Sequence, residues 1–169
     1  MNGENRLNAE YEKSPFANHN TMENAINDNG VIITHFRGLS MQPMLRQDKD
    51  LIVIEKLTRP LKKFDVPLYR YKSGKLVLHR IISIKNGKYI IRGDNLMNKE
   101  YSVTDDMVIG VLKGFYRNNK YVDCKTSKLY KVYIYMNLCS FPFRYFWRVF
   151  ALPMLSKIKR TLFPKQRRS

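Results

Sequence analysis

Residues 35–45 read HFRGLSMQPML and place one serine, Ser40, in a turn between an apolar segment and a proline. The preceding run, residues 31–36, is short and rich in β-branched side chains, which predicts a buried or half-buried strand. Gly38 permits a tight turn in which the Ser40 hydroxyl and its own backbone N–H face the same point, and Pro43 stops a regular strand from continuing. The same pattern fits a purely structural turn, so a nucleophilic role for Ser40 requires a base nearby.

The remainder of the chain predicts a mainly β protein. Short apolar segments alternate with turn signals, including an Asn-Gly pair at residues 86–87. The predicted strands are residues 31–36, 51–56, 66–71, 76–84, 88–92 and 107–116. The strand containing Pro67 is expected at a sheet edge, because proline cannot donate to a ladder. We therefore expect a small, coiled, antiparallel sheet of barrel-like form, with a short helix over residues 21–30 and C-terminal amphipathic helices.

His79 is the preferred candidate for the base. It lies within an otherwise apolar strand, where burial favours the neutral imidazole that can accept a proton from Ser40. A hydrogen-bonded core histidine would give the same sequence pattern. The other two histidines are His19, in the polar N-terminal segment, and His35, in the strand before the serine.

Three aspartates are candidates for the acid that supports the histidine. Asp94 follows His79 by fifteen residues, at the end of the next hairpin strand, and an acid there could orient the imidazole and stabilise its charged form. Asp105 and Asp106, just before the last predicted strand, are alternatives for the same role.

Four short sequence boxes resemble those of the signal peptidases. Residues 38–45 match the serine box, Ser-Met-x-Pro with a glycine two before the serine. Residues 48–53 match the box Gly-Asp-x-Val, which starts a strand in that family. Residues 78–82 match the next box, which contains the base, and residues 93–95 match the Gly-Asp-Asn box. Lys49 stands where the second box has glycine. The four boxes occur in the family's order and lie within residues 31–112.

This resemblance implies a serine endopeptidase of the histidine type, acting on a signal or leader peptide. The common bacterial enzymes use a lysine base, whereas the archaeal and endoplasmic-reticulum types carry histidine. The resemblance assigns Ser40 as nucleophile, His79 as general base and then general acid, and Asp94 as supporting acid, with the Ser40 backbone N–H facing the oxyanion. Asp105 or Asp106 would match a second aspartate that the histidine-type enzymes place after the Gly-Asp-Asn box.

The charge is strongly positive and unevenly distributed. The chain holds 31 Lys and Arg residues against 14 Asp and Glu residues, a net charge of +17, although residues 1–30 are net negative. Such a balance predicts an anionic partner, either a membrane surface or nucleic acid. Because the aromatic residues are clustered apart from most of the charge, the membrane surface is preferred.

Residues 129–155 carry the features of a helix that lies in a membrane interface. If this segment is helical, its polar residues fall on one narrow face and aromatic and aliphatic residues cover the rest, with the arginines extending outward. The polar positions are Asn137, Ser140, Arg144 and Arg148. A polybasic stretch at residues 157–168 follows, which anionic lipid would attract. A helical hairpin packed on the β domain is the alternative.

The expected location is peripheral, on the cytoplasmic face of a membrane. Residues 1–30 contain no apolar segment long enough to span, and the longest charge-free run in the C-terminal part, Val132–Phe143, is also too short. The two cysteines, Cys124 and Cys139, form no disulfide or metal-binding pattern, which favours a reducing compartment. An integral protein with one C-terminal span is the alternative.

The sequence divides into a polar lead-in with a short helix at residues 1–30, a peptidase β domain at 31–122 and an aromatic, basic C-terminal segment at 123–169. No phosphate loop, metal-binding cluster or nucleotide fingerprint occurs in the sequence, so no cofactor is implied. Two other functions remain open beside the peptidase. One is a catalytically silent or regulatory domain of the same fold, and the other is a basic nucleic-acid-binding module.

Overall fold

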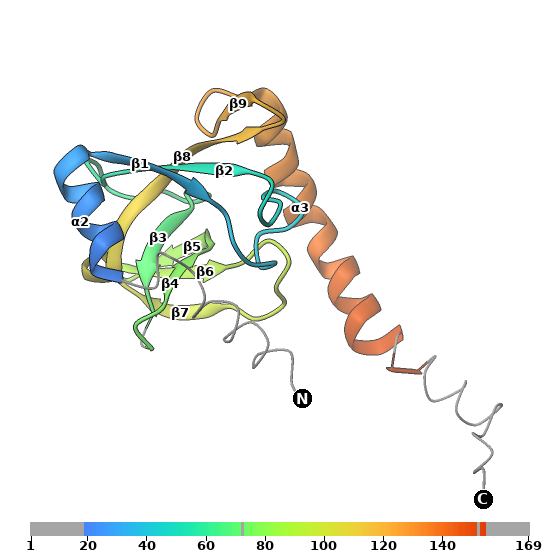
Figure 1. Cartoon of the computed structure of the whole chain (residues 1–169). Coiled ribbons are helices and arrows are strands. Elements are labelled where there is room, and N and C mark those ends of the chain that lie inside the picture. Colours follow the sequence, from blue (N-terminus) through green and yellow to red (C-terminus); the bar gives the residue numbers. More distant parts are fainter. Residues whose placement is uncertain (1–18, 72, 152, 155–169) are drawn as a thin grey trace, which may run out of the picture. The chain divides into compact units, whose positions relative to one another are not determined.

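The computed structural model describes residues 19–71, 73–151 and 153–154, and it is mainly β (Figure 1). Strands outnumber helices, the sheets are antiparallel, and one long helix follows them. The predicted mainly β class, with antiparallel sheets and a C-terminal helix, is confirmed. Residues 1–18 of the predicted lead-in and the polybasic stretch at 157–168 lie outside the described residues.

The first element of the described residues is helix α2, His19–Asn29, which leads directly into strand β1, Val31–His35. Gly30 ends the helix with a φ of 74°, and its N–H donates to the carbonyl oxygen of Ile26 over 2.9 Å. Glycine adopts this left-handed conformation without the steric cost of a Cβ, which makes it a common helix terminator. The sequence predicted this helix and strand correctly, although α2 begins two residues earlier than expected.

Six strands form the larger sheet, in the order β1-β2-β8-β3-β4, with β9 paired to β8. The strands after β1 are β2 Leu51–Glu55, β3 Pro67–Arg70, β4 Leu76–Leu78, β8 Val108–Arg117 and β9 Lys120–Asp123. The prediction of an edge position for β3 was wrong, because β3 lies between β8 and β4. Pro67 is tolerated there because it is the first residue of the strand.

The smaller sheet has the order β5-β6-β7. Its strands are β5 Arg80–Lys85, β6 Lys88–Arg92 and β7 Glu100–Val103. The predicted Asn-Gly turn joins β5 to β6, with positive φ at both residues (49° at Asn86 and 69° at Gly87). The strand predicted over residues 76–84 is in fact two, because the chain leaves the larger sheet after Leu78 and enters the smaller one at Arg80. His79 is the residue at this change of sheet.

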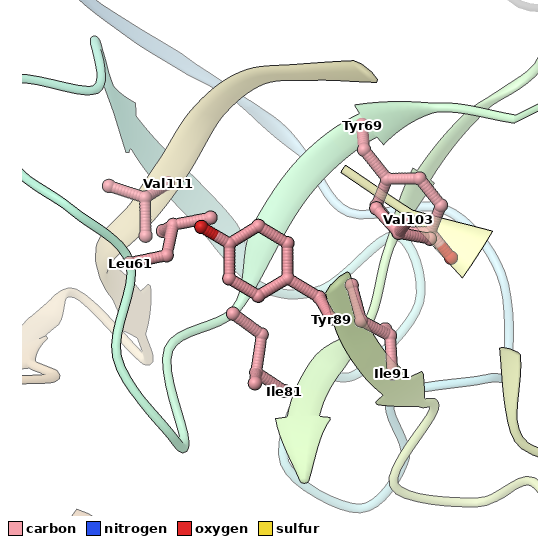
Figure 2. Close-up of a cluster of buried hydrophobic side chains, with 7 residues drawn as sticks. All are labelled: Leu61, Tyr69, Ile81, Tyr89, Ile91, Val103 and Val111. Carbon is pink, nitrogen blue, oxygen red and sulfur yellow. The ribbon is translucent and has the colours of Figure 1, made fainter. Parts of the chain in front are cut away.

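The hydrophobic core draws side chains from both sheets (Figure 2). Tyr69 and Val111 come from the larger sheet, and Ile81, Tyr89, Ile91 and Val103 come from the smaller one, with Leu61 added from a loop. All seven are buried. Burying apolar surface in this way is the main favourable contribution to folding, and it fixes the two sheets against one another.

The chain divides into two compact units, Met1–Lys131 and Val132–Ser169. The predicted boundary lay earlier, at residue 122. The first turn of helix α3, Lys128–Phe146, belongs to the first unit, and the π-helical turn Trp147–Ala151 belongs to the second. Within the described part of the chain, no helix combines the length and apolar character needed to cross a membrane.

Candidate active site

Ser40 lies in the turn between β1 and β2 and is half-buried. The turn is anchored by Met41 and Leu45, which are both fully buried, and the Leu45 N–H donates to the Met41 carbonyl oxygen over 3.0 Å. Gly38 has a φ of 106°, a conformation that favours glycine and lets the chain reverse before the serine. The predicted turn is therefore present, and the buried side chains of Met41 and Leu45 hold it in place.

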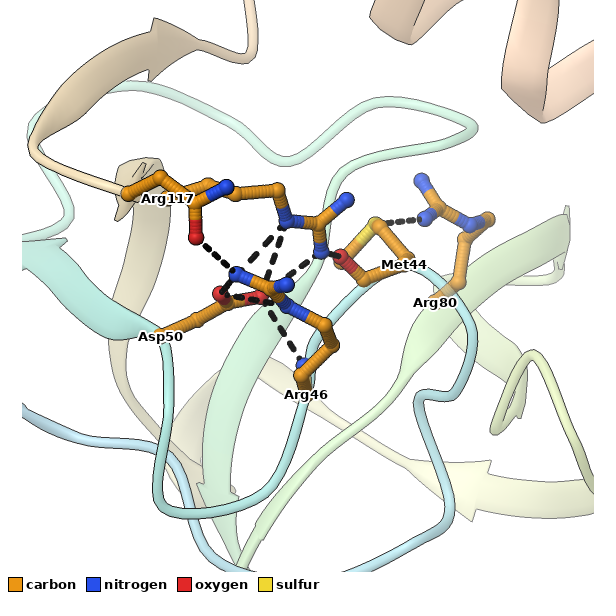
Figure 3. Close-up of polar contacts among 6 residues, drawn as sticks. Met44, Arg46, Asp50, Arg80 and Arg117 are labelled. Carbon is orange, nitrogen blue, oxygen red and sulfur yellow. Dashed lines mark hydrogen bonds and ion pairs between the residues drawn. The ribbon is translucent and has the colours of Figure 1, made fainter.

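A buried carboxylate, that of Asp50, lies at the C-terminal end of this turn, directly before β2 (Figure 3). Asp50 is fully buried and accepts hydrogen bonds from Arg46 (Nη2 to Oδ1, 2.8 Å) and Arg117 (Nη2 to Oδ2, 2.6 Å). Arg117 also donates to the Met44 carbonyl oxygen over 2.5 Å. Burial alone would raise the pKa of Asp50, but the hydrogen bonds from Arg117 and Arg46 outweigh burial and hold the pKa below its usual range. The ion cluster thereby joins the end of the serine turn to strand β8.

The serine turn packs directly on the loop that follows β6. The Asn95 N–H donates to the Ser40 carbonyl oxygen over 2.8 Å, and the Asn95 side-chain amide donates to the Leu39 carbonyl oxygen over 3.2 Å. A Cβ at Gly93 would lie 2.7 Å from the Ser40 carbonyl oxygen, too close for any side chain. Gly93 is therefore required by this close approach, and it brings the serine box and the Gly-Asp-Asn box together.

His79 is buried at the change from β4 to β5, where two acceptors meet its ring. Its Nδ1 lies 2.8 Å from the Glu100 Oε1 and 3.3 Å from the Tyr69 hydroxyl. The Tyr69 hydroxyl in turn donates to the Glu100 Oε2 over 2.6 Å. Since an ionised carboxylate can only accept, Nδ1 carries a proton in this arrangement, and the neutral form of the ring is the tautomer with its lone pair on Nε2. A neutral imidazole in this tautomer can act as a base through Nε2.

Glu100 is suited to remain ionised beside the histidine. Burial alone would raise the pKa of its carboxyl group, but the hydrogen bonds from His79 and Tyr69 more than offset burial and hold the pKa below its usual range. Glu100 is also one of the residues that line a cavity of about 250 Å³ along β7, and its side chain is partly exposed. The burial of Tyr69 and its bond to Glu100 also raise the pKa of the Tyr69 hydroxyl, which keeps it a donor.

The expectation that Asp94 supports His79 differs from the structure. Both Asp94 oxygens accept from the Arg80 guanidinium, Oδ1 from Nε and Oδ2 from Nη2, each over 2.8 Å, and both side chains are almost fully buried. The reason is geometric. Consecutive side chains of an extended segment point to opposite sides, so His79 and Arg80 diverge. The pairing of Arg80 with Arg92 in the β5–β6 register then places the loop with Asp94 beside Arg80.

Arg80 uses its remaining donors to connect several segments. It reaches the Phe64 carbonyl oxygen (3.1 Å), the Tyr130 hydroxyl (2.9 Å) and the Met44 sulfur (2.6 Å). Figure 3 shows the last of these contacts next to the Asp50 cluster. Arg80 and Asp94 thus form a buried ion pair that holds the serine turn against the β5–β6 sheet.

The two alternative aspartates do not reach the histidine in the described structure. Asp105 is exposed and accepts a hydrogen bond from the Tyr89 hydroxyl over 2.5 Å. Burial and this bond raise the pKa of Tyr89 to about 12. Asp106 is exposed, in the same 3₁₀ turn, Asp105–Met107. The carboxylate that meets His79 is Glu100, which the sequence analysis missed.

Ser40 and His79 both lie near the start of β5 and the end of β6 in the smaller sheet, but no hydrogen bond joins their side chains. Ser40 is attached through Asn95, and His79 directly precedes β5. Among the contacts of the described residues, no hydrogen bond joins the Ser40 hydroxyl to the His79 ring. In proteins without bound substrate, catalytic hydrogen bonds are often long or poorly aligned, and they tighten only when substrate binds.

No family model matches the chain, and no curated protein matches it. Within residues 19–71, 73–151 and 153–154, no group of three or more histidine, cysteine, aspartate or glutamate side chains is placed to hold a metal ion. The site is therefore described by its own geometry.

Proposed function

We propose that this chain is a serine endopeptidase of the signal-peptidase type, with Ser40 as nucleophile, His79 as base and Glu100 as the acid that supports His79. The observation that carries the proposal is the 2.8 Å contact between His79 Nδ1 and Glu100. A buried histidine held by a carboxylate on one nitrogen is the arrangement that activates a serine hydroxyl through the other nitrogen. The four sequence boxes and the mainly β fold are further support.

In the proposed reaction, the Ser40 oxygen attacks the carbonyl carbon of the scissile peptide bond while His79 Nε2 takes the hydroxyl proton. Glu100 stabilises the imidazolium that forms, and His79 then gives the proton to the leaving amine. The tetrahedral oxyanion is met by the Ser40 backbone N–H. Water next attacks the acyl-enzyme, with His79 again acting as base, and releases the second product.

An extended peptide is the substrate that suits the surroundings of the serine. Strand β1, which leads into the serine turn, is at one end of the strand order of the larger sheet. Val31 and Ile33 on this strand are exposed. An edge strand offers backbone donors and acceptors to an added strand, which is a common mode of peptide binding. A signal or leader peptide is the proposed substrate class.

We also propose that the chain works in peripheral association with an anionic membrane surface, at the cytoplasmic face. The support is the net charge of +17 together with the aromatic and basic character of residues 129–168. Negatively charged lipid of the cytoplasmic leaflet attracts such segments.

A catalytically silent domain of the same fold is the second candidate, and one observation favours it. The Ser40 hydroxyl and the His79 ring are not hydrogen-bonded in the described structure. If the two side chains never meet, Glu100 would simply satisfy a buried histidine.

Cleavage of peptides separates the two candidates. The full chain is incubated with synthetic signal and leader peptides, and products are identified by mass spectrometry. Cleavage at a single bond, lost in Ser40→Ala and in His79→Ala but retained in Ser83→Ala, would support the peptidase. Cleavage that persists in Ser40→Ala would come from a contaminating peptidase and contradict the assignment. Ser83 is a suitable control because it is also a half-buried serine but lies on β5, outside the turn that contains Ser40.

A further inference from the structure

We infer that one face of helix α3 is the surface that inserts into an anionic bilayer, with the helix axis lying along the membrane. This inference rests on the proposed membrane association and adds the residues that make the contact. It concerns binding and not the peptidase chemistry.

The face is a continuous row of exposed apolar side chains. Its members on α3 are Val132, Met136, Cys139, Phe143 and Phe146, separated by three or four residues. This spacing places them on one side of a helix. Met136 is 66% exposed and Phe143 is 70% exposed, which is unusual for side chains of this size.

The row continues into the π-helical turn after α3. Trp147 and Phe150 are exposed there, and the Phe150 ring stacks on the Phe146 ring with centroids 5.7 Å apart. Tryptophan is enriched at membrane interfaces, because its ring is apolar and its N–H can reach polar groups. We call the seven residues from Val132 to Phe150 in this row the apolar stripe.

The polar groups of the helix lie away from the apolar stripe and bond to one another. The Asn137 side-chain amide donates to the Tyr133 hydroxyl (3.1 Å), and the Asn137 carbonyl oxygen accepts from the Ser140 hydroxyl (3.0 Å) and from Arg144 (3.2 Å). The narrow polar face predicted from the sequence is present for these residues. Arg144 differs from the expectation in folding back along the helix. The side chain of Arg148 lies outside the description.

The positive charge of the C-terminal segment indicates that the apolar stripe binds an anionic membrane. Residues 124–169 contain eleven Lys or Arg residues and no Asp or Glu. Lys128 and Lys131, at the start of α3, are exposed. A surface that combines an apolar row with an excess of basic residues binds anionic lipid both by burying apolar side chains and by electrostatic attraction. In the proposed contact, the apolar side chains of the stripe enter the boundary between headgroups and acyl chains.

A second copy of the chain is a poorer occupant. Each copy carries a net charge of +17, so two copies repel one another at low ionic strength. Nucleic acid would match the charge of the segment, but the seven residues of the apolar stripe include no basic side chain to contact phosphates beside the aromatic rings.

Trp147 is the only tryptophan of the chain, so its fluorescence reports directly on the apolar stripe. The full chain is titrated with vesicles of phosphatidylcholine containing phosphatidylglycerol, and with vesicles of phosphatidylcholine alone. We expect the emission to move to shorter wavelength with the anionic vesicles and much less with the neutral ones. Sedimentation with the vesicles measures binding independently of fluorescence.

Two matched variants test the face. Phe143→Asp places a charge on the apolar stripe and should weaken vesicle binding about tenfold or more. Tyr145→Asp introduces the same charge two residues later, about 160° around the helix, and should weaken it far less. Circular dichroism checks that both variants keep their helix.

The inference about the face is overturned if the protein sediments with anionic vesicles while Trp147 emission stays unchanged, or if the two variants weaken binding equally. It is also overturned if the emission shift appears without lipid and grows with protein concentration, which would indicate a second copy. Absence of binding to any vesicle would overturn both the face and the proposed membrane association. Cleavage of a water-soluble peptide, measured on the same samples, tests the peptidase proposal separately.

Discussion

The Glu100 Oε1 lies 2.8 Å from His79 Nδ1, although the two residues are 21 positions apart in the sequence. His79 occupies the position at which the chain passes from the larger sheet to the smaller one, and Glu100 begins β7. Tyr69, from β3, bonds to the same carboxylate. This relationship turns a buried histidine into a candidate base and gives the predictions below.

Replacing Glu100 by glutamine should impair catalysis more than binding. The amide keeps the shape of the side chain but cannot stabilise a charged imidazole, so we expect kcat to fall about 10²- to 10⁴-fold with little change in KM. Peptide cleavage kinetics measure both constants. An unchanged kcat would show that Glu100 only satisfies a buried histidine.

The lowered pKa of Glu100 predicts a pH-dependent contribution to stability. A carboxyl group whose pKa is lower in the folded state stabilises the fold above its ordinary pKa, near 4.5, and loses that contribution as pH falls through the lower folded pKa. Urea unfolding should therefore show a larger loss of stability on acidification in the wild type than in Glu100→Gln. Asp50 also has a lowered pKa but is present in both proteins, so the difference isolates Glu100. Parallel stability curves across this range would contradict the prediction.

Asp94→Asn should act mainly on stability. The substitution leaves the buried Arg80 cation without its carboxylate, a change that typically costs about 3 kcal/mol in the free energy of unfolding. At low temperature, where the variant is still folded, activity per folded molecule should stay closer to that of the wild type than in Glu100→Gln. If Asp94→Asn instead abolishes activity with little loss of stability, Asp94 is the supporting acid that the sequence suggested.

Gly93→Ala should separate the serine turn from the loop after β6. The added Cβ would lie 2.7 Å from the Ser40 carbonyl oxygen, so the two segments must move apart. We expect a loss of about 1–3 kcal/mol in stability and a marked fall in cleavage. Gly87→Asn is a useful control, since asparagine tolerates the positive φ of 69° and no atom lies within 4 Å of a Cβ there. Equal activity of the Gly93→Ala variant and the wild type would mean that this close approach is not needed.

Local sequence signals predicted the strands with clear β-branched composition and glycine turns. The helix before Gly30, the turn at Asn86 and Gly87 and the run before Ser40 all follow from backbone preferences of single residues. The break at His79 could not be predicted this way, because an apolar strand that changes sheet has the same composition as one that does not.

The supporting acid was missed for a related reason. Glu100–Val103 is a four-residue strand within a polar stretch, and only its pairing with β6 makes it a strand. Without β7, nothing in the sequence places Glu100 near a histidine 21 residues earlier. Asp94 is nearer in sequence and sits in a recognisable box, but the alternation of side chains assigns it to Arg80. Its contribution is to the placement of the serine turn.

The central claim is that His79 activates Ser40, and the most direct measurement is acylation of the purified full chain by a serine-directed covalent probe. The modified residue is located by mass spectrometry in the wild type, Ser40→Ala, His79→Ala and Glu100→Gln. The account predicts an adduct on Ser40 that is absent from Ser40→Ala, nearly absent from His79→Ala and slow to form in Glu100→Gln. Modification of Ser40 at the same rate with and without His79, or no modification in a preparation that also cleaves no peptide, would contradict it.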